Sequence, residues 1–311
     1  MPLGLLADPG GKLLMEKYDL CLLSTTKDLL RKAVLSKDNT AVLVGNPTFD
    51  LSEAQQRTAF QKLGTLPPQP QPEPMTVLVS GSRSRDQGAG NKLPSLPGTG
   101  DEVLAVSNLL QQQHWQLATY TGDRAVKEVV KQVRSPRLLH LATHGFFLPD
   151  QQIKTEALGS DKPSGLEDPM LRSGLYFAGA DRALAGLQIP SDLDNGVLTA
   201  YEAAGLNLQG TELVVLSACN TGQGEVKNGE GVFGLRRALQ EAGAQAVMLS
   251  LWSVPDKETQ ELMTTFYSNW LSGMEKHEAL RRAQLEIREE IKQRYGRDLP
   301  YYWGAFVLVG R

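Results

Sequence analysis

The 311-residue sequence has few cysteines, few histidines, few aromatic residues and no excess of basic residues. Its two cysteines cannot build a disulfide framework, so the composition favours a reducing compartment such as the cytoplasm. With 32 basic against 35 acidic residues, nucleic acid is not expected as a direct partner. No apolar run reaches the roughly 18 residues that a bilayer span requires, so no membrane partner is expected either. The first residues, MPLGLLADPGGKLL, lack the basic flank and cleavage site of a secretory signal.

Short apolar segments alternate along the chain with amphipathic ones, which predicts an α/β fold with a mostly parallel central sheet. Several of the apolar segments are continuous, as is typical of strands that helices cover on both faces. We expect strands at 18–23, 40–45, 75–80, 137–143, 212–218, 246–252 and 304–310. We expect helices at 101–113, 123–134, 231–242, 256–272 and 275–295.

Three stretches interrupt this alternation. Residues 64–74, GTLPPQPQPEP, are proline-rich and predict an extended, exposed linker. Residues 81–100 are polar and rich in glycine, which indicates a mobile loop. Residues 148–196 also have the composition of a loop, and long loops in compact α/β domains are often functional.

The residues with the most chemical potential follow two of the expected strands. Strand 137–143 leads to His144 and Gly145, and strand 212–218 leads to Cys219. Ligands of open α/β sheets bind at the carboxyl ends of the strands, so neighbouring parallel strands would bring the imidazole to the sulfur. A nearby imidazole raises the thiolate fraction of a cysteine, and backbone N–H groups at Gly145 and Cys219 could hold an oxyanion. This combination outlines cysteine-dependent peptide cleavage.

Each of these residues also has a purely structural interpretation. A free cysteine at the end of a buried strand more often packs as a small hydrophobic residue, and this packing is expected of Cys21. His140 lies among leucines and is interpreted as a packed, hydrogen-bonded core histidine. The spacing of His140 and His144 is typical of a zinc helix, but Leu141 replaces the glutamate and the segment reads as a strand, so no metal is expected. The glycine-rich stretch 222–231 lacks a Gly-Lys-Ser/Thr ending, so no nucleotide or other cofactor is expected.

Taken together, LLHLATHGFF, PMLRSGLYFAGA, LSACNTGQGEVKNGEGVFGLRRALQEAG and YYWGAFVLVG resemble the CHAT domain. This family comprises bacterial relatives of caspases and separases that are associated with tetratricopeptide repeats. The resemblance is most specific over 137–311 and weaker before it. It implies a caspase-like α/β/α sandwich with a mostly parallel central sheet. It also implies a catalytic domain over 101–311, preceded by the amino-terminal half of the CHAT region over 1–100, which has room for a pseudo-protease lobe.

The resemblance implies a histidine–cysteine dyad and the activity of a cysteine endopeptidase on a protein or peptide substrate. The family's Thr-His-Gly motif matches residues 143–145, with His144 as the base. Its Ser-Ala-Cys-x-Thr-Gly motif matches residues 217–222, with Cys219 as the nucleophile. This chain has Asn220 where the family commonly has glutamate, which should alter the rim of the site more than the reaction.

Related separases and metacaspases prefer a basic residue before the scissile bond, so acidic groups are expected in the substrate pocket. Asp256 is the first candidate, Glu230 a second, and Trp252 could form a wall of the pocket. Alternatively, Asp256 starts a helix where an acidic side chain is stabilised, Glu230 is an exposed loop acid, and Trp252 belongs to the core.

Family members are commonly controlled by a tetratricopeptide-type sensor domain or by an activator protein. No repeat of about 34 residues is visible in this chain, so we expect either a fragment of a longer protein or activation in trans. Weak activity in isolation follows from this expectation. The alternative function is an interaction module of the same fold in which the dyad is catalytically idle.

Overall fold

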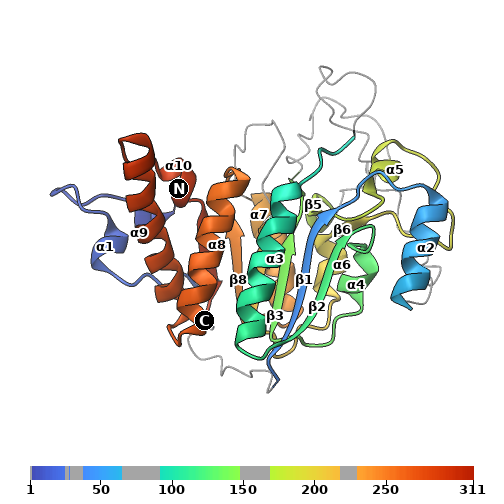
Figure 1. Cartoon of the computed structure of the whole chain (residues 1–311), viewed down its shortest axis with the longest axis horizontal. Helices are drawn as coiled ribbons and strands as arrows, with labels where there is room; N and C mark the ends of the chain where they lie inside the picture. Colours follow the sequence, from blue (N-terminus) through green and yellow to red (C-terminus); the bar gives the residue numbers. More distant parts are fainter. Residues whose placement is uncertain (1, 25–27, 29–37, 65–91, 148–168, 218–229) are drawn as a thin grey trace, which may run out of the picture.

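The computed structural model describes residues 2–24, 28, 38–64, 92–147, 169–217 and 230–311, except for the side chains of 169 and 230–233. A six-stranded sheet forms the centre of the molecule, with the strand order β2-β1-β3-β7-β8-β9 (Figure 1). Its strands are β1 (Thr40–Pro47), β2 (Gln116–Gly122), β3 (Leu138–Ala142), β7 (Leu213–Leu216), β8 (Ala246–Ser250) and β9 (Phe306–Gly310). The first five strands in this order, from β2 to β8, are parallel to one another. The last strand of the order, β9, runs antiparallel to its neighbour β8.

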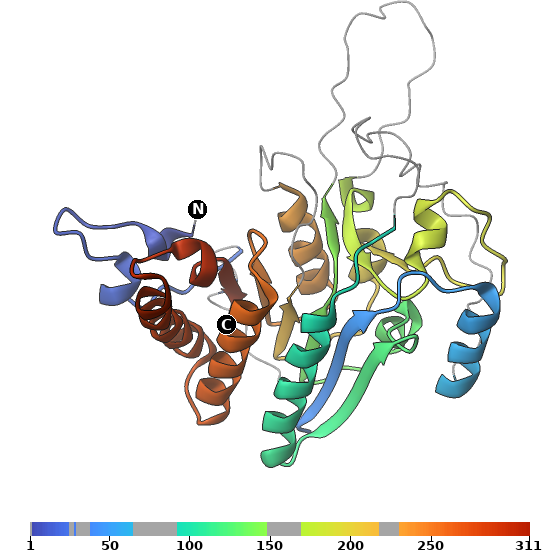
Figure 2. The same ribbon diagram turned by 45° about the horizontal axis from the view of Figure 1, so that its top comes forward.

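Helices cover one face of this sheet in a row that includes the longest helices of the described chain (Figures 1 and 2). They are α3 (Pro97–Gln112), α8 (Asp256–Leu271) and α9 (Lys276–Tyr295), with the short α10 (Pro300–Trp303) before β9. The amino-terminal segment, with η1 (Leu3–Leu5) and α1 (Leu14–Lys17), lies beside α9 and β9. The apolar stripe of α9 is buried against the core on this face of the sheet, and it comprises Leu280, Ala283, Ile287 and Ile291.

The opposite face is covered by shorter helices and a second, three-stranded antiparallel sheet of order β4-β5-β6. The helices are α2 (Glu53–Leu63), α4 (Lys127–Lys131), α5 (Ala180–Leu184), α6 (Ala200–Ala204) and α7 (Glu230–Glu241). The small sheet contains β4 (Gly145–Phe147), β5 (Ser173–Tyr176) and β6 (Val197–Thr199), and η4 (Pro169–Leu171) precedes β5. An apolar core lies on each side of the central sheet, which makes the molecule an α/β/α sandwich.

The alternating side chains of a central strand show why its sequence is continuously apolar. In β3, Leu138 and Ala142 join the core under α3 and α8, whereas Leu139 and Leu141 join the core on the opposite face. Because successive side chains of a strand point to opposite faces, a strand covered twice must be apolar at almost every position. His140 is the exception in β3, and it points to the α3 and α8 side.

Most of the expected elements are present, with some corrections. The strands expected at 40–45, 137–143, 212–218, 246–252 and 304–310 are confirmed, and so are the expected helices. The strand expected at 18–23 is wrong: its residues form only one isolated bridge, between Leu22 and Val309, and Cys21 is exposed rather than packed in the core. The strand expected at 75–80 lies outside the described residues.

Two expected loops contain regular structure where the chain is described. Helix α3 begins at Pro97, inside the loop expected at 81–100, because proline is well suited to the first turn of a helix. The loop expected at 148–196 contains β5 and α5 in its described part. Within the described residues, no helix combines the length and the apolar character needed to cross a bilayer.

Candidate functional site

His144 lies where the chain passes from the central sheet into the small sheet. Strand β3 ends at Ala142, and Gly145 begins β4, which pairs with β5. The hydroxyl of Thr143 donates a hydrogen bond to the carbonyl of Tyr176, and the N–H of Tyr176 donates to the carbonyl of His144 at 2.9 Å. The backbone around His144 is therefore fixed by β5, and the imidazole is held at the carboxyl edge of the parallel strands.

Strand β7, which leads toward Cys219, lies directly beside β3. The two strands are parallel, with Leu141 opposite Leu216, and the N–H of Ser217 donates to the carbonyl of Leu141 at 3.0 Å. The segments that precede His144 and Cys219 thus end side by side at the same edge of the sheet. Cys219 itself lies outside the described residues.

The His144 imidazole is enclosed and held by one hydrogen bond. Its side chain is only 1% exposed, and the ring stacks on Phe49 with 5.3 Å between the ring centroids. Nε2 lies 2.9 Å from the carbonyl oxygen of Pro94. Because a carbonyl can only accept, Nε2 carries the proton of the neutral ring, and Nδ1 keeps its lone pair. Nδ1 is buried and has no hydrogen-bond partner among the described residues.

The charge state of His144 reflects this enclosure. Burial lowers the pKa of the imidazole below its usual 6.5, while the Pro94 carbonyl and the carboxylates of Asp256 and Asp181 act in the opposite direction. The net result favours the neutral ring, which is the form that can accept a proton.

Asp256 is the first residue of α8 and is exposed. It packs closely against the first turn of α3: a Cβ atom on Gly98 would lie 2.3 Å from the Cβ of Asp256. Only glycine fits at position 98, since real Cβ atoms do not approach this closely. The helix-start interpretation of Asp256 is confirmed, because Asp256 is the first residue of α8.

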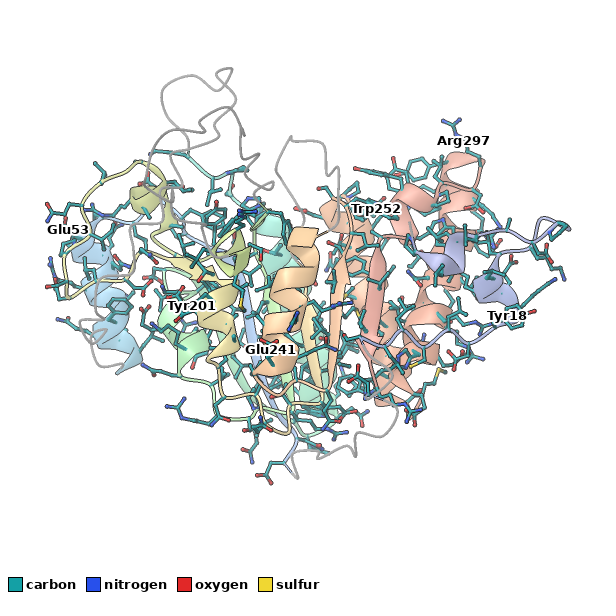
Figure 3. All side chains as sticks on the ribbon, turned by 180° about the vertical axis from the view of Figure 1, so that it is seen from behind. Tyr18, Glu53, Tyr201, Glu241, Trp252 and Arg297 are labelled. Atoms are coloured by element: carbon teal, nitrogen blue, oxygen red, sulfur yellow. The ribbon has the colours of Figure 1, made fainter. Side chains whose placement is uncertain are left out.

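Trp252 follows β8 at the same edge of the sheet, in the upper half of Figure 3. It is half-buried, and its indole N–H donates to the carbonyl of Tyr301 at 2.9 Å. The ring packs partly against the core under α8 and α9, as the structural interpretation of this residue predicted. Glu230 begins α7, but its side chain lies outside the described residues.

A buried polar network lies below this edge, between the central sheet and the helices α3 and α8. His140 is fully buried, and its Nδ1 lies 2.9 Å from the hydroxyl of Tyr267. Its Nε2 lies 3.1 Å from a carboxylate oxygen of Glu102, close enough for an ion pair although the two atoms are not aligned as a hydrogen bond. Ser217 donates to the other oxygen of Glu102 at 2.9 Å. The interpretation of His140 as a hydrogen-bonded core residue is confirmed, and the network ties β3 to β7.

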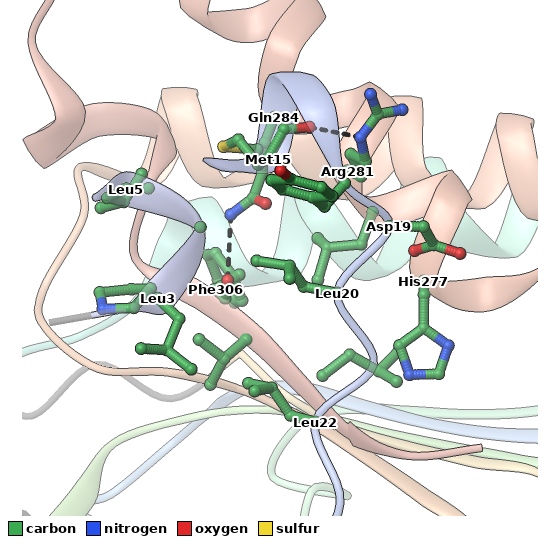
Figure 4. A pocket seen from close by; sticks show the side chains of 17 residues that line it. Leu3, Leu5, Met15, Asp19, Leu20, Leu22, His277, Arg281, Gln284 and Phe306 are labelled. Atoms are coloured by element: carbon green, nitrogen blue, oxygen red, sulfur yellow. Dashed lines mark hydrogen bonds between the residues drawn. The ribbon is translucent and has the colours of Figure 1, made fainter. Parts of the chain in front are cut away.

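An apolar pocket lies elsewhere, between the amino-terminal segment and the surface of α9 and β9 (Figure 4). Two of its polar side chains are already engaged, since Arg281 donates to the carbonyl of Met15 and Gln284 donates to the carbonyl of Phe306. None of its lining residues belongs to the surroundings of His144. Within the described part of the chain, no three His, Cys, Asp or Glu side chains are grouped so as to hold a metal ion.

A comparison with protein families matches the model of the CHAT domain to residues 1–311. This chain belongs to the CHAT domain family. The expected α/β sandwich with a mostly parallel central sheet is confirmed for this CHAT domain.

Among curated proteins, the CHAT domain is similar to tetratricopeptide repeat protein 28 of Homo sapiens, with 27% identity over 228 residues, and of Mus musculus, with 27% identity over 220 residues. Each match covers 69% of this chain but only 8% of the relative, so the chain spans a small part of the length of these proteins. Among solved structures, the Arg-specific cysteine proteinase gingipain R matches with a TM-score of 0.43 and 10% identity, over 90% of this chain and 48% of that one.

The structure of this CHAT domain adds residues that the sequence did not indicate. Pro94 contributes a backbone carbonyl, which leaves no side-chain signature, and it lies in a segment whose composition suggested a loop. Phe49 and Asp181 approach His144 from segments distant in sequence. The proline at 97, which marks the start of α3, is the one signal that could have shown ordered structure beside Pro94.

Proposed function

We propose that this CHAT domain is a cysteine endopeptidase in which His144 is the general base and Cys219 the nucleophile. The observation that carries the proposal is the hydrogen bond between His144 and Pro94 at the edge where β3 and β7 end side by side. An activated nucleophile needs a base whose orientation is fixed by a third group. Here the Pro94 carbonyl is that group, and it leaves Nδ1 free to take a proton.

The proposed reaction is acyl transfer. Nδ1 of His144 takes the thiol proton, and the sulfur of Cys219 forms a bond to the scissile carbonyl carbon. When the tetrahedral intermediate collapses, the C–N bond breaks and the imidazolium gives its proton to the leaving amine. Water then adds to the thioester with His144 again as base, which releases the carboxylic acid and restores the thiol. Backbone N–H groups of Gly145 and Cys219 are the proposed donors to the oxyanion.

Cleavage after a basic residue is the proposed specificity. Asp256 begins α8 against the first turn of α3, and α3 directly follows the segment that carries the Pro94 carbonyl to His144, so its carboxylate is the proposed group that attracts a cationic side chain beside the scissile bond. Glu230 and Trp252 complete the proposed pocket as a second acid and a wall. The division at residue 100, the cytoplasmic location and the family's bacterial context stay predictions.

The proposed function is tested by labelling the intact chain with an electrophilic ketone that carries arginine or lysine. We expect the parent to be modified at Cys219, and we expect Cys219→Ala and His144→Ala to stay unmodified because one lacks the nucleophile and the other its base. Cys21→Ala is the matched control, since it removes the other of the two cysteines and should label like the parent. Mass spectrometry of the intact protein measures the result.

The same experiment decides between the peptidase and an idle interaction module. One observation favours the module: the His144 side chain is only 1% exposed, so a substrate would need the surrounding residues to move. The tetratricopeptide repeat proteins among the relatives support a regulatory sensor domain or activator as the partner that causes this movement. Absence of label in the parent, also after candidate activators are added, would identify the module.

Asp256→Ala should lower kcat/KM for peptides with arginine before the scissile bond by at least about tenfold, which corresponds to about 1.4 kcal/mol. Cleavage of peptides with an uncharged residue at this position should change much less. Stability should fall by no more than about 1 kcal/mol, the usual effect of an acid at a helix amino terminus. Glu275→Ala, at the exposed start of α9, is the matched control. Equal losses for both peptides would rule Asp256 out as a specificity residue.

A further inference from the structure

Asp181 is a buried carboxylate that contacts both sides of the His144 enclosure. It is the second residue of α5 and is only 6% exposed. One of its oxygens, Oδ1, accepts a hydrogen bond from the N–H of Leu93 at 2.9 Å. Its own backbone N–H donates to the carbonyl of Phe49, the residue that stacks on His144. Asp181 thus connects Phe49, whose ring covers His144, with the segment around Pro94, whose carbonyl accepts from Nε2 of His144.

Residues 92–96, which we call the strap, carry the Pro94 carbonyl across His144. Proline has no N–H, so residue 94 cannot be fixed by a backbone donor of its own. The N–H of Leu93 is the adjacent donor, and Asp181 is its acceptor. At the other end of the strap, the carbonyl of Leu96 accepts from both the N–H and the hydroxyl of Thr99. The backbone of the strap is therefore held on each side of Pro94, once by Asp181 and once by the start of α3, while an ion pair of Lys92 with Asp50 and the packing of Leu93 and Leu96 hold its side chains.

Burying the carboxylate of Asp181 costs desolvation free energy, which argues that this side chain has a role that requires a carboxylate. Burial raises the pKa of Asp181, and the nearby carboxylate of Asp50 adds to this, while the Leu93 N–H, Lys92 and His144 lower it. The other oxygen, Oδ2, is buried without a hydrogen-bond partner among the described residues. A side chain that only filled space would avoid this desolvation. Asp181 is too deeply buried to bind substrate itself.

We propose that Asp181 is a positioning residue for His144: by accepting the Leu93 N–H it holds the strap where the Pro94 carbonyl fixes the proton on Nε2. A catalytic role of Asp181 rests on the proposed function. Its effect on the position of the His144 proton does not depend on that function. Without the hydrogen bond to Asp181, the strap can move, Nε2 loses its acceptor, and the proton is no longer confined to one ring nitrogen.

Nitrogen NMR of the histidine rings in the intact protein tests this directly. The chain has four histidines, and His144→Gln identifies the His144 signals. We expect the parent to show the Nε2–H tautomer at His144, Asp181→Ala to show a mixture of tautomers, and Asp181→Asn, which keeps an acceptor for Leu93, to behave like the parent. The signals of His140, which bonds to Tyr267 in the core, report whether each variant is folded.

Retention of the parent tautomer in folded Asp181→Ala would overturn the proposal, and so would its loss in Asp181→Asn. Because the measurement reads the ring and not peptide cleavage, it gives an answer even if the chain cleaves nothing. If the chain is a peptidase, Asp181→Ala should lower kcat by about 10- to 100-fold with KM unchanged, the usual consequence of a misplaced catalytic group. Asp181→Asn should restore most of this loss.

Discussion

Replacing His144 by glutamine is expected to lower kcat/KM for peptide cleavage by about 10²- to 10⁴-fold, the usual contribution of a positioned general base. Glutamine can still donate an N–H to the Pro94 carbonyl, so the substitution removes the basic Nδ1 and disturbs little else. Burial holds the pKa of His144 below 6.5, so the parent retains its neutral base through the neutral pH range in which rates are compared.

If His144 and Cys219 form one dyad, the effects of replacing them should not add. Residues that act as one catalytic unit have strongly non-additive effects. Cys219→Ala should therefore remove activity as completely as the double variant with His144→Gln, and adding the second substitution should cost nothing further. His114→Gln is the matched control, because His114 is exposed after α3 and should leave the rate unchanged. If the loss of rate in the double variant were the product of the losses in the two single variants, the two residues would not act as one dyad.

The candidate site could be predicted in part because two of its segments carry local signals. Continuous apolar strands that end in reactive residues singled out β3 and β7, on the condition that they are parallel neighbours, and the pairing of Leu141 with Leu216 meets this condition. The enclosure of His144 could not be predicted. It depends on the Pro94 carbonyl and on Phe49 and Asp181, which are brought together by tertiary packing and follow no periodic pattern.

Several strands and helices of the structure were not predicted from the sequence, and each has a physical reason. Strand β2 is an edge strand with mostly half-buried residues, so its sequence lacks a continuous apolar run. Strands β4 to β6 have only three or four residues each, too few for a period of two to show. Helix α2 has the capping box of Ser52 and Gln55, a usable signal, but it buries only Gln56, Ala59 and Phe60 and so shows little periodicity.

Lys127 shows most clearly how tertiary structure can reverse the expectation for a residue type. On an expected amphipathic helix a lysine should be solvated, yet Lys127 is 2% exposed at the start of α4. Its ammonium group lies 3.1 Å from Asp194 and 2.8 Å from Glu202, and it donates to the carbonyl of Val197 at 3.0 Å. These contacts fasten β6, and through β5 they support β4, which begins at Gly145 directly after His144.

The charges in this cluster depend on Lys127. Burial by itself would raise the pKa of Asp194, but the ammonium group of Lys127, together with hydrogen bonds from Glu128 and from the N–H of Gly196, outweighs it and holds that pKa below 3.8. For the neighbouring Glu128, burial and the charge of Asp194 raise the pKa to about 9, so this carboxyl stays protonated at neutral pH. Lys127 is therefore the cation that allows Asp194 to remain ionised inside the protein.

Lys127→Met should lower the free energy of unfolding at pH 7 by about 3–5 kcal/mol, the cost of leaving a buried partner charge uncompensated. The sign of the pH dependence follows from Asp194: a depressed pKa stabilises the folded state above the unfolded value of 3.8, and this stability is lost as pH falls through the folded pKa. The difference between parent and variant should thus be largest at neutral pH and shrink toward pH 3, as the Asp194 carboxyl becomes protonated in the variant, where Lys127 no longer lowers its pKa. Denaturant unfolding at several pH values measures it, with the half-buried Lys131→Met as the matched control, expected to cost less than about 1 kcal/mol. A difference that stays constant down to pH 3 would show that Lys127 contributes packing instead of charge.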